Sequence, residues 1–264
     1  MRIYPTFKEA YLRLIGSLMT TGSRVRPNYW QSMDVSQRAE AEMLEILNTS
    51  FSVPLVSEGL ACYQRDIQPN LPWADRHFEL ERASGKPINP GETWKEWPWG
   101  LSADKFRKNE LFEHTYAERY WPKETEGAAG PHLNRGIRYP YGDLEDVVSR
   151  LIADPMTRQA VLSVWHPEDQ YNGGQRVPCS LFYQFIQRNG YLHIVYTIRS
   201  CDALRHLRDD IYLTVRLLLW VLEQLREQQT DFHWSKVKPG TFTMHITSLH
   251  CFIGDKQKLE QSLL

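Results

Sequence analysis

Two strand-like runs joined by an Asn-Gly turn constrain the fold of this chain more than any other feature of its sequence. Leu181–Gln187 and Tyr191–Ile198 are rich in β-branched and aromatic residues, and Arg188-Asn189-Gly190 connects them. An Asn-Gly pair favours the left-handed backbone of a tight hairpin turn. Antiparallel pairing about this turn puts Arg199, which follows the second run, within a residue of Ser180. We therefore expect a hairpin that returns Arg199 to the start of its first strand.

Other periodic segments add helices and strands to this hairpin. Apolar residues at helical spacing predict helices over 7–21, Val35–Leu47, Ala74–Ala83, Leu144–Ala153, Asp210–Glu227 and Lys256–Leu263, and β-rich runs predict strands over Ala160–Trp165 and Thr241–Thr247. Pro69–Gly100 contains four tryptophans and ends in an irregular stretch, and such aromatic loops often line a pocket. The 264 residues, 42% of them hydrophobic, can bury a large core. We predict one α+β domain over residues 1–264.

The charge balance excludes several classes of function. Charged residues make up 24% of the chain and the formal net charge is −1, whereas electrostatic binding of nucleic acid requires a basic excess. We therefore expect no DNA partner. No apolar run reaches membrane-spanning length, and the first residues lack the pattern of a signal peptide. A cytoplasmic protein without a membrane partner is the expectation.

Cysteine usage singles out one residue. The four cysteines form no CxxC pair, which argues against a zinc site or a disulfide framework, so we expect no bound metal. Cys179 follows Arg176-Val177-Pro178, where proline fixes the backbone before the first hairpin strand. A cysteine attacks as its thiolate, which nearby positive charge favours, and the hairpin supplies Arg199. A buried, inert cysteine beside an incidental arginine is the alternative.

These residues belong to an ordered set of motifs that resembles the thymidylate synthases and the related pyrimidine hydroxymethylases. The set comprises DPMTRQAVLSVW from Asp154, VPCSLFYQF around Cys179, RSCD from Arg199, and Ser248-Leu249-His250. Each motif is weak alone, but their order is specific. The resemblance is dense over about Asp154–Leu213 and patchy before residue 110. It implies a three-layer α+β fold, in which helices pack on a large mixed β-sheet and one sheet face forms a homodimer interface.

The resemblance implies roles for the matching residues at the nucleophile. Cys179 would add to C6 of a pyrimidine monophosphate and so turn C5 into a nucleophile. Arg199 would hold the phosphate and favour the thiolate, Ser200 would also contact the phosphate, and Asp202 would contact the base. Of the four, only Cys179 would form a covalent bond with the substrate.

Further arginines would complete the phosphate site. Arg158 would reach the phosphate of the partner subunit, but the family's second arginine is replaced by Gln159. This replacement is expected to weaken phosphate affinity, because arginine contacts are among the stronger charge-assisted ones. Either Arg24 or Arg26 would bind the phosphate of its own subunit. Plain surface charge is the alternative for these arginines.

Two positions depart from an ordinary thymidylate synthase. His250 matches the histidine that bonds the sugar, but Phe252 replaces the usual tyrosine and cannot donate a hydrogen bond to a 3′-hydroxyl. Ser180 occupies the position after the nucleophile, where thymidylate synthases commonly carry histidine. Both departures argue against an ordinary thymidylate synthase.

Asp210 is the most informative position for the choice of base. Thymidylate synthases carry asparagine there, whereas cytidylate hydroxymethylases resemble this chain in carrying aspartate. A carboxyl group can accept from the amino group of cytosine and share a proton with N3, while an ionised carboxylate repels O4 of uracil. An acidic residue that merely opens a helix is the alternative.

The first half of the chain should supply the remaining active-site groups. Glu79 or Glu81 could match the family glutamate that shuttles protons, and a dry pocket would raise its pKa. Tyr116 matches a tyrosine near the nucleophile. Trp94 and Trp97 are candidates for packing against a folate, with ordinary core packing as the alternative.

The implied transferase reaction uses 5,10-methylenetetrahydrofolate as its one-carbon donor. Water addition after carbon transfer would give 5-hydroxymethylcytidylate from dCMP or CMP, whereas hydride transfer would give a 5-methyl product. We predict a (deoxy)cytidylate 5-hydroxymethyltransferase, with a thymidylate synthase or dUMP hydroxymethylase as the alternative enzyme. A catalytically silent nucleotide- or RNA-binding homologue is the alternative of another class. The sugar preference and the biological setting, bacteriophage DNA modification or nucleoside-antibiotic synthesis, stay open.

Overall fold

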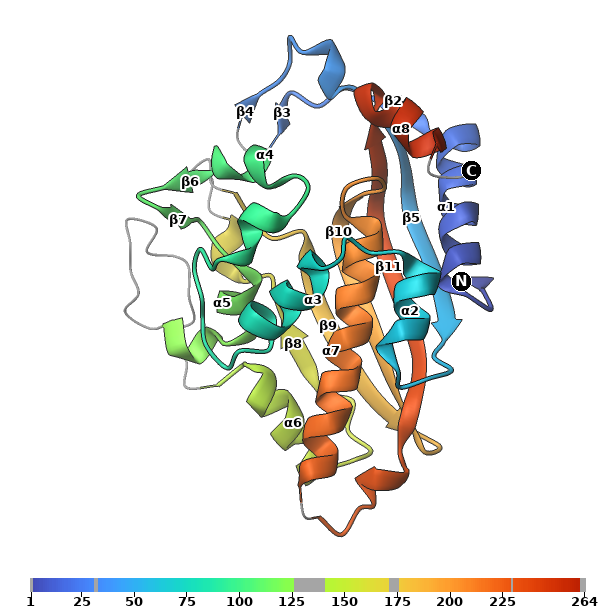
Figure 1. Ribbon diagram of the computed structural model, residues 1–264, viewed down its shortest axis with the longest axis vertical. Helices are drawn as coiled ribbons and strands as arrows, with labels where there is room; N and C mark the ends of the chain where they lie inside the picture. Colours follow the sequence, from blue (N-terminus) through green and yellow to red (C-terminus); the bar gives the residue numbers. More distant parts are fainter. Residues whose placement is uncertain (1, 31–32, 126–140, 171–175, 229, 262–264) are drawn as a thin grey trace.

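A seven-stranded mixed sheet forms the centre of the molecule (Figure 1). The structure is a computed structural model that describes residues 2–30, 33–125, 141–170, 176–228 and 230–261. The strand order is β1-β5-β11-β10-β9-β8, with β2 paired to β5. The bounds are β1 (Arg2–Ile3), β2 (Ser23–Val25), β5 (Met43–Pro54), β8 (Val161–Ser163), β9 (Ser180–Arg188), β10 (Tyr191–Asp202) and β11 (Lys238–Phe252). β10 runs parallel to β11 and β1 parallel to β5, and the other pairs are antiparallel.

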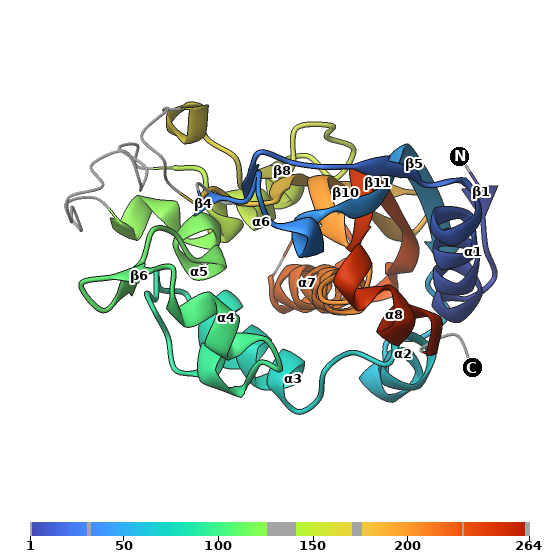
Figure 2. The same ribbon diagram turned by 90° about the horizontal axis from the view of Figure 1, so that it is seen from above.

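Short strands and helices surround this sheet. Two small ribbons pair β3 (Tyr29–Trp30) with β4 (Met33–Asp34) and β6 (Arg107–Lys108) with β7 (Leu111–Phe112). The α-helices are α1 (Phe7–Thr21), α2 (Leu60–Ile67), α3 (Trp73–His77), α4 (Gly100–Asp104), α5 (Tyr116–Tyr120), α6 (Leu144–Ala153), α7 (Leu207–Glu227) and α8 (Lys256–Gln261). Figure 2 shows the sheet, the central helix α7, and the segment that carries α3 and α4 as successive layers. The predicted three-layer α+β architecture is therefore confirmed.

The central helix α7 accounts for much of the core. Leu213, Leu217 and Val221 recur at helical spacing, and each is at most 1% exposed. Burying side chains of this size stabilises the fold by roughly 1.5–3 kcal/mol each. Packing of this apolar face, more than helix propensity, holds α7 against the sheet and so fixes its first turn, which carries Asp210.

The predicted hairpin is confirmed as β9 and β10. Asn189 and Gly190 have φ values of 53° and 80°, and a two-residue type I′ turn requires positive φ at both positions. At the far end of the hairpin, Ile198 pairs with Ser180, which leaves Leu181 as an extra residue in β9. Because side chains alternate along a strand, this bulge turns Ser180 towards the buried face of the sheet.

Most other predicted elements are also present. The helices over 7–21 and Leu144–Ala153 have the predicted bounds, and the helix predicted over Asp210–Glu227 begins three residues earlier. The strand predicted over Thr241–Thr247 extends in both directions to become β11. The last helix ends at Gln261, and the rest of its predicted range lies outside the described residues.

The helix predicted over Val35–Leu47 is wrong. A short 3-10 helix covers Ala39–Ala41, and β5 begins at Met43. The apolar residues that suggested a helix instead pair with β11, where Ile46 lies opposite Leu249. Pairing with a strand distant in the sequence therefore overrides the local periodicity.

The helix predicted over Ala74–Ala83 is interrupted. α3 ends at His77, and residues Phe78–Arg82 form a π-helical turn. A π-turn adds a residue to the helical repeat and rotates the side chains that follow it.

No helix among the described residues combines the length and apolar character needed to cross a membrane.

Candidate active site

The sulfur of Cys179 lies beside the guanidinium of Arg199. Cys179 directly precedes β9, and the Arg199 amide donates to its carbonyl at 2.9 Å. The guanidinium donates through Nε to the Pro178 carbonyl at 2.9 Å and through Nη2 to the Val177 carbonyl at 3.3 Å. The same Nη2 lies 3.9 Å from the Cys179 sulfur. Backbone carbonyls therefore fix a positive charge at the candidate nucleophile.

Burial and opposing charges set the acidity of the Cys179 thiol. Burial raises its pKa, and the positive charge of Arg199 lowers it. The negative charge of Asp210 raises the pKa again, with weaker effects from Arg176, which lowers it, and Asp202, which raises it. Because the net pKa lies above the ordinary value, the resting group is a thiol. The charge of Arg199 acts in favour of the thiolate, but burial outweighs it.

A network of buried hydroxyls adjoins the nucleophile. Ser180 Oγ lies 2.9 Å from the Tyr116 hydroxyl and 2.7 Å from the Tyr196 hydroxyl. Thr115 caps α5 and so positions Tyr116, since its Oγ1 accepts from the Glu118 amide at 3.2 Å. Burial raises the pKa of Tyr116, so its phenol stays neutral. These hydroxyls can donate to or accept from a substrate atom near Cys179.

Adjacent aspartates in the first turn of α7 have different environments. Asp209 accepts from the Asn70 amide and side chain, both at 2.8 Å, and from Trp97 Nε1 at 3.3 Å. Within the part of the chain that the structure describes, Asp210 Oδ2 instead accepts only a weak bond from the Cys201 thiol at 3.7 Å. Burial raises the pKa of Asp210 to about 7. Asp209 thus anchors a loop, whereas Asp210 keeps hydrogen-bonding capacity for a ligand.

The ends of β10 and β11 gather further predicted residues. Ser200 lies opposite Ser248, and Asp202 lies opposite His250. Asp202 Oδ1 accepts from the backbone amides of residues 204 and 205 at 2.9 and 3.0 Å, so this carboxylate holds the turn into α7. His250 is buried, and its Nδ1 has no hydrogen-bond partner among the described residues. The ring of Phe252 lies edge-on at 5.7 Å from His250.

Comparison with known proteins shows which family has a sequence like this one. The model of the thymidylate synthase family matches residues 81–263, more than half of the chain. The chain belongs to the thymidylate synthase family. It is 29% identical over 149 residues to a deoxyuridylate hydroxymethyltransferase of Bacillus phage SP01, across 55% of this chain and 35% of that protein. It is 27% identical over 193 residues to a thymidylate synthase of Streptococcus thermophilus, across 67% of this chain and 63% of that protein. The chain thus spans less than two thirds of both relatives.

In this thymidylate synthase family member, the two candidate glutamates have separate environments. Glu79 is 62% exposed and forms a salt bridge with Arg216 at 2.8 Å. Glu81 is 4% exposed, accepts from the Thr93 amide at 2.9 Å and Thr93 Oγ1 at 2.7 Å, and lies 3.0 Å from Nδ1 of His77. Burial acts to raise the pKa of Glu81, but bonds from His77 and Thr93 bring it below the ordinary value. The expected raised pKa is therefore wrong for Glu81.

The predicted folate tryptophans also differ in their surroundings. Trp97 stacks on His206 at 4.9 Å and packs against Trp73 at 5.8 Å. Trp94 is partly exposed, with Arg107 and Lys95 over its ring at 4.7 and 5.7 Å. Trp97 joins α3 to the start of α7, whereas Trp94 offers an aromatic surface beside two cations.

The peripheral arginines lie at the protein surface. Arg24 on β2 is exposed and pairs with Glu42 at 3.4 Å, and Arg26, just after β2, is also exposed. Arg158 is exposed before β8, and its carbonyl accepts from Gln184 at 2.9 Å. These positions are accessible to a ligand or to another subunit.

Arg82 is a feature that the sequence did not single out. It is 4% exposed, and its guanidinium lies 4.2 Å from the centre of the Tyr116 ring. The sequence contains one weak indication of its position. In an α-helix, a residue three positions after Glu79 would lie on the same helical face as that candidate glutamate. The π-turn determines where this side chain points.

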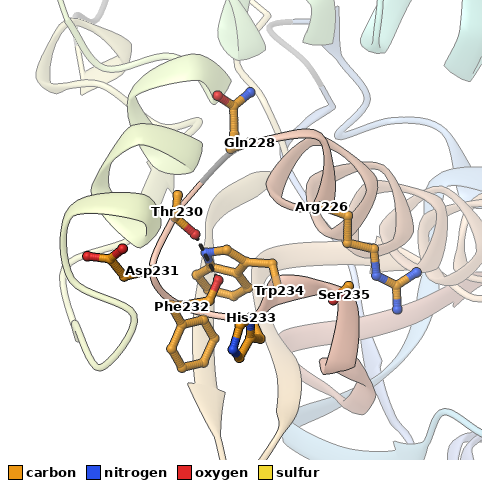
Figure 3. A pocket seen from close by; sticks show the side chains of 8 residues that line it. All are labelled: Arg226, Gln228, Thr230, Asp231, Phe232, His233, Trp234 and Ser235. Carbon is orange, nitrogen blue, oxygen red and sulfur yellow. Dashed lines mark hydrogen bonds between the residues drawn. The ribbon is translucent and has the colours of Figure 1, made fainter.

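A surface hollow elsewhere in the molecule is separate from this site. Arg226, Phe232, His233 and Trp234 help to line it beyond the C-terminal end of α7 (Figure 3). Asp210 and Arg226 lie near opposite ends of that helix, roughly 24 Å apart along its axis at about 1.5 Å per residue. The hollow contains none of the predicted site residues.

Proposed function

We propose that this chain transfers a one-carbon unit from 5,10-methylenetetrahydrofolate to C5 of a pyrimidine nucleoside monophosphate. The observation that carries the proposal is the Cys179 sulfur 3.9 Å from Arg199, in a site that also contains Asp210. A nucleophile, a fixed cation and a group able to read the base edge are what such a reaction needs. We propose dCMP or CMP as the substrate and a 5-hydroxymethyl product.

In this proposal each residue has the role that its match to the family implies. The Cys179 thiol gives its proton to water, and its sulfur forms a bond to C6 as the electron pair of the C5–C6 double bond moves towards C5. Asp210 shares a proton with N3 and thereby offsets the negative charge that develops on the ring. Arg199 stabilises the thiolate and binds the phosphate, with Ser200 beside it. The hydroxyl network around Tyr116 orders water near C5.

The folate supplies the one-carbon unit when bound. Trp94, with Arg107 and Lys95 over its ring, suits a ligand that carries a flat ring and carboxylates. The Trp97 ring already packs against Trp73 and His206. It would therefore support the residues of the folate site without contacting the folate ring itself. Either Glu79 or Glu81 would move protons during the reaction.

We also propose that the active enzyme is a homodimer. Helices α1, α2, α7 and α8 lie on one side of the sheet in Figure 2, which leaves the other face for a second subunit. Exposed Arg158 would reach the phosphate in the partner's site, while Arg24 or Arg26 would contact the phosphate in its own. Arg158→Ala mixed with Cys179→Ser would test this sharing, because only a shared site regains activity in mixed dimers.

A substrate assay tests the reaction. The enzyme is incubated with labelled methylenetetrahydrofolate and with dCMP, CMP or dUMP separately, and the products are separated. Label in 5-hydroxymethylcytidylate supports the proposal, and Cys179→Ser should abolish it. Turnover of dUMP alone would overturn the cytosine assignment, and turnover that survives Cys179→Ser would overturn the covalent mechanism.

A deoxyuridylate hydroxymethyltransferase is the second candidate. One relative carries that name, and an Asp210 carboxyl with a pKa of about 7 can hold a proton at neutral pH. A protonated carboxyl offers one donor and one acceptor, which match O4 and N3–H of uracil. The same assay distinguishes the candidates, since this one predicts 5-hydroxymethyl-dUMP.

A further inference from the structure

Arg82 is a buried cation that forms no salt bridge with a carboxylate among the described residues. The residue is 4% exposed, its Nε donates to Nε2 of His77 at 3.0 Å, and its Nη1 donates to the Tyr120 hydroxyl at 3.1 Å. A buried charge that lacks a charged partner is costly. The charge of Arg82 can therefore be compensated only through a neighbour that itself contacts an anion.

The imidazole of His77 connects Arg82 to a buried carboxylate. Because an arginine Nε can only donate, Nε2 of His77 must accept, and a neutral ring then carries its hydrogen on Nδ1. Burial lowers the pKa of His77, which keeps the ring neutral. Nδ1 lies 3.0 Å from Oε2 of Glu81 and 3.0 Å from Oγ1 of Thr93, whose own hydrogen goes to Glu81 Oε1 at 2.7 Å. Glu81 therefore fixes the tautomer of His77 that can hold Arg82.

The guanidinium held in this way lies over the ring of Tyr116. Its central carbon is 4.2 Å from the ring centre, and Tyr120, which accepts from Nη1, packs edge-on against the same ring at 6.3 Å. A cation over an aromatic face binds it most strongly where water is excluded. The Tyr116 hydroxyl lies 2.9 Å from Ser180 Oγ, next to the nucleophile Cys179. The cation on its face and the ring at its edge therefore restrict where this hydroxyl can lie.

We propose that Arg82 is a positioning residue for the reaction, because it holds the Tyr116 hydroxyl beside Ser180. Glu81 keeps Arg82 in place through the imidazole of His77. The inference rests on the proposed function, in which the hydroxyls around Tyr116 order water near C5. Arg82 itself need not touch the substrate. Its loss would free the Tyr116 ring to shift and so misplace the water at the reacting carbon.

This role predicts a loss of kcat with little change in nucleotide affinity. The proposed function assigns the phosphate to Arg199 and the base edge to Asp210, and within the described residues neither side chain forms a hydrogen bond or an ion pair with Arg82. A misplacement of about 1 Å at a reacting centre can cost about 100-fold in rate. A residue that only filled space would not separate kcat from KM.

Steady-state kinetics of two variants test the role. Arg82→Met removes the guanidinium, and His77→Phe keeps a ring that can stack on Trp73, which packs on His77 at 4.9 Å, but removes both nitrogens. Each should lower kcat about tenfold to a hundredfold and change the nucleotide KM by less than about threefold. Val221→Ala truncates a buried residue further along α7 and controls for a general loss of stability. Its kcat should stay within about twofold of wild type.

The Tyr116→Phe background shows whether Arg82 acts through the hydroxyl. In that background Arg82→Met should lower kcat by less than about a further twofold, because the group that Arg82 positions is already absent. His77→Phe gives the same comparison if Arg82→Met does not fold. A loss of kcat in Glu81→Gln that disappears in this background is likewise a positioning effect, whereas a loss that persists belongs to proton transfer. Single variants with full kcat, or losses that multiply in the double variants, would overturn the inference.

Nitrogen-15 NMR of the histidine-labelled protein tests the imidazole bridge without turnover. The signals of His77, assigned by their loss in His77→Phe, should show hydrogen on Nδ1 and none on Nε2 near neutral pH. Hydrogen on Nε2 would overturn the inference whatever the activity. If wild type turns over no nucleotide, the proposed function fails, and the tautomer still decides whether Glu81 and Arg82 are bridged. A wild type that turns over a nucleotide while the losses multiply keeps the proposed function and removes the inference.

Discussion

Replacement of Asp210 by asparagine should stabilise the protein at alkaline pH. Burial raises the pKa of Asp210 from its ordinary value of 3.8 to about 7. Between these pH values the unfolded chain releases the proton while the folded chain keeps it. Stability is therefore lost as pH rises from about 4 to about 7, and the loss is complete above that range. An asparagine side chain carries no titratable group, so the Asp210→Asn variant lacks this loss.

The size of the effect follows from the same two values. A change from 3.8 to about 7 corresponds to roughly 4 kcal/mol, at about 1.36 kcal/mol for each pH unit. Residue Asp210 as a whole is only partly buried, and screening reduces the expected difference to roughly 2–3 kcal/mol. A difference of that size would shift the unfolding midpoint by several degrees in a protein of this length.

Urea unfolding at a series of pH values between 4 and 9 measures the difference directly. The free energy of unfolding of wild type should fall relative to that of Asp210→Asn as pH rises to about 7, then remain level. Asp231→Asn makes the same chemical change at an exposed position and controls for the substitution itself. Parallel profiles for wild type and Asp210→Asn would refute the buried, weakly bonded environment on which the base assignment depends.

Three further predictions address the nucleophile, the phosphate and the glutamates. Cys179→Ser should abolish turnover yet leave the nucleotide Kd within about threefold, measured by calorimetry. Arg199→Lys should raise the nucleotide KM about tenfold, because a planar guanidinium binds both the backbone carbonyls and a phosphate better than an ammonium does; an unchanged KM would exclude the phosphate role. Glu81→Gln should cost roughly 1–3 kcal/mol of stability in urea unfolding, since buried Thr93 donates to it, whereas Glu79→Gln at the surface should cost less than about 1 kcal/mol. Loss of kcat in only one of these two variants would identify the catalytic glutamate.

The fold could be predicted where the signal is local. The Asn189-Gly190 turn and the alternating strands around it define β9 and β10, and these place Arg199 beside Cys179. β5 could not be predicted in the same way, because its strand state depends on pairing with β11, which lies about 200 residues further along the chain. The residues of β5 taken alone have mixed helical and strand character.

The part of the site that lies around the hairpin and α7 could be predicted, and the part contributed by the first half of the chain could not. Cys179, Arg199 and Asp210 lie on elements whose register is set by strong patterns, and the structure brings them together. The orientation of the Glu79 and Arg82 side chains could not be predicted. The π-helical turn changes which residues face inward, and its sequence contains no pattern that distinguishes a π-turn from an α-helix. The burial of a lone guanidinium among tyrosine rings likewise depends on the whole fold.

The bulge at Leu181 has a consequence for how this chain can vary. If Leu181 paired with Ile198 in place of Ser180, simple alternation along β9 would be restored, and Ser180 would rotate to the opposite face, away from the hydroxyls of Tyr116 and Tyr196. Every chemical group would still be present, yet the sulfur and its cation would no longer share a register. The pairing register of β9, fixed to a single residue by the bulge, is thus as strict a requirement for chemistry here as the identity of the nucleophile.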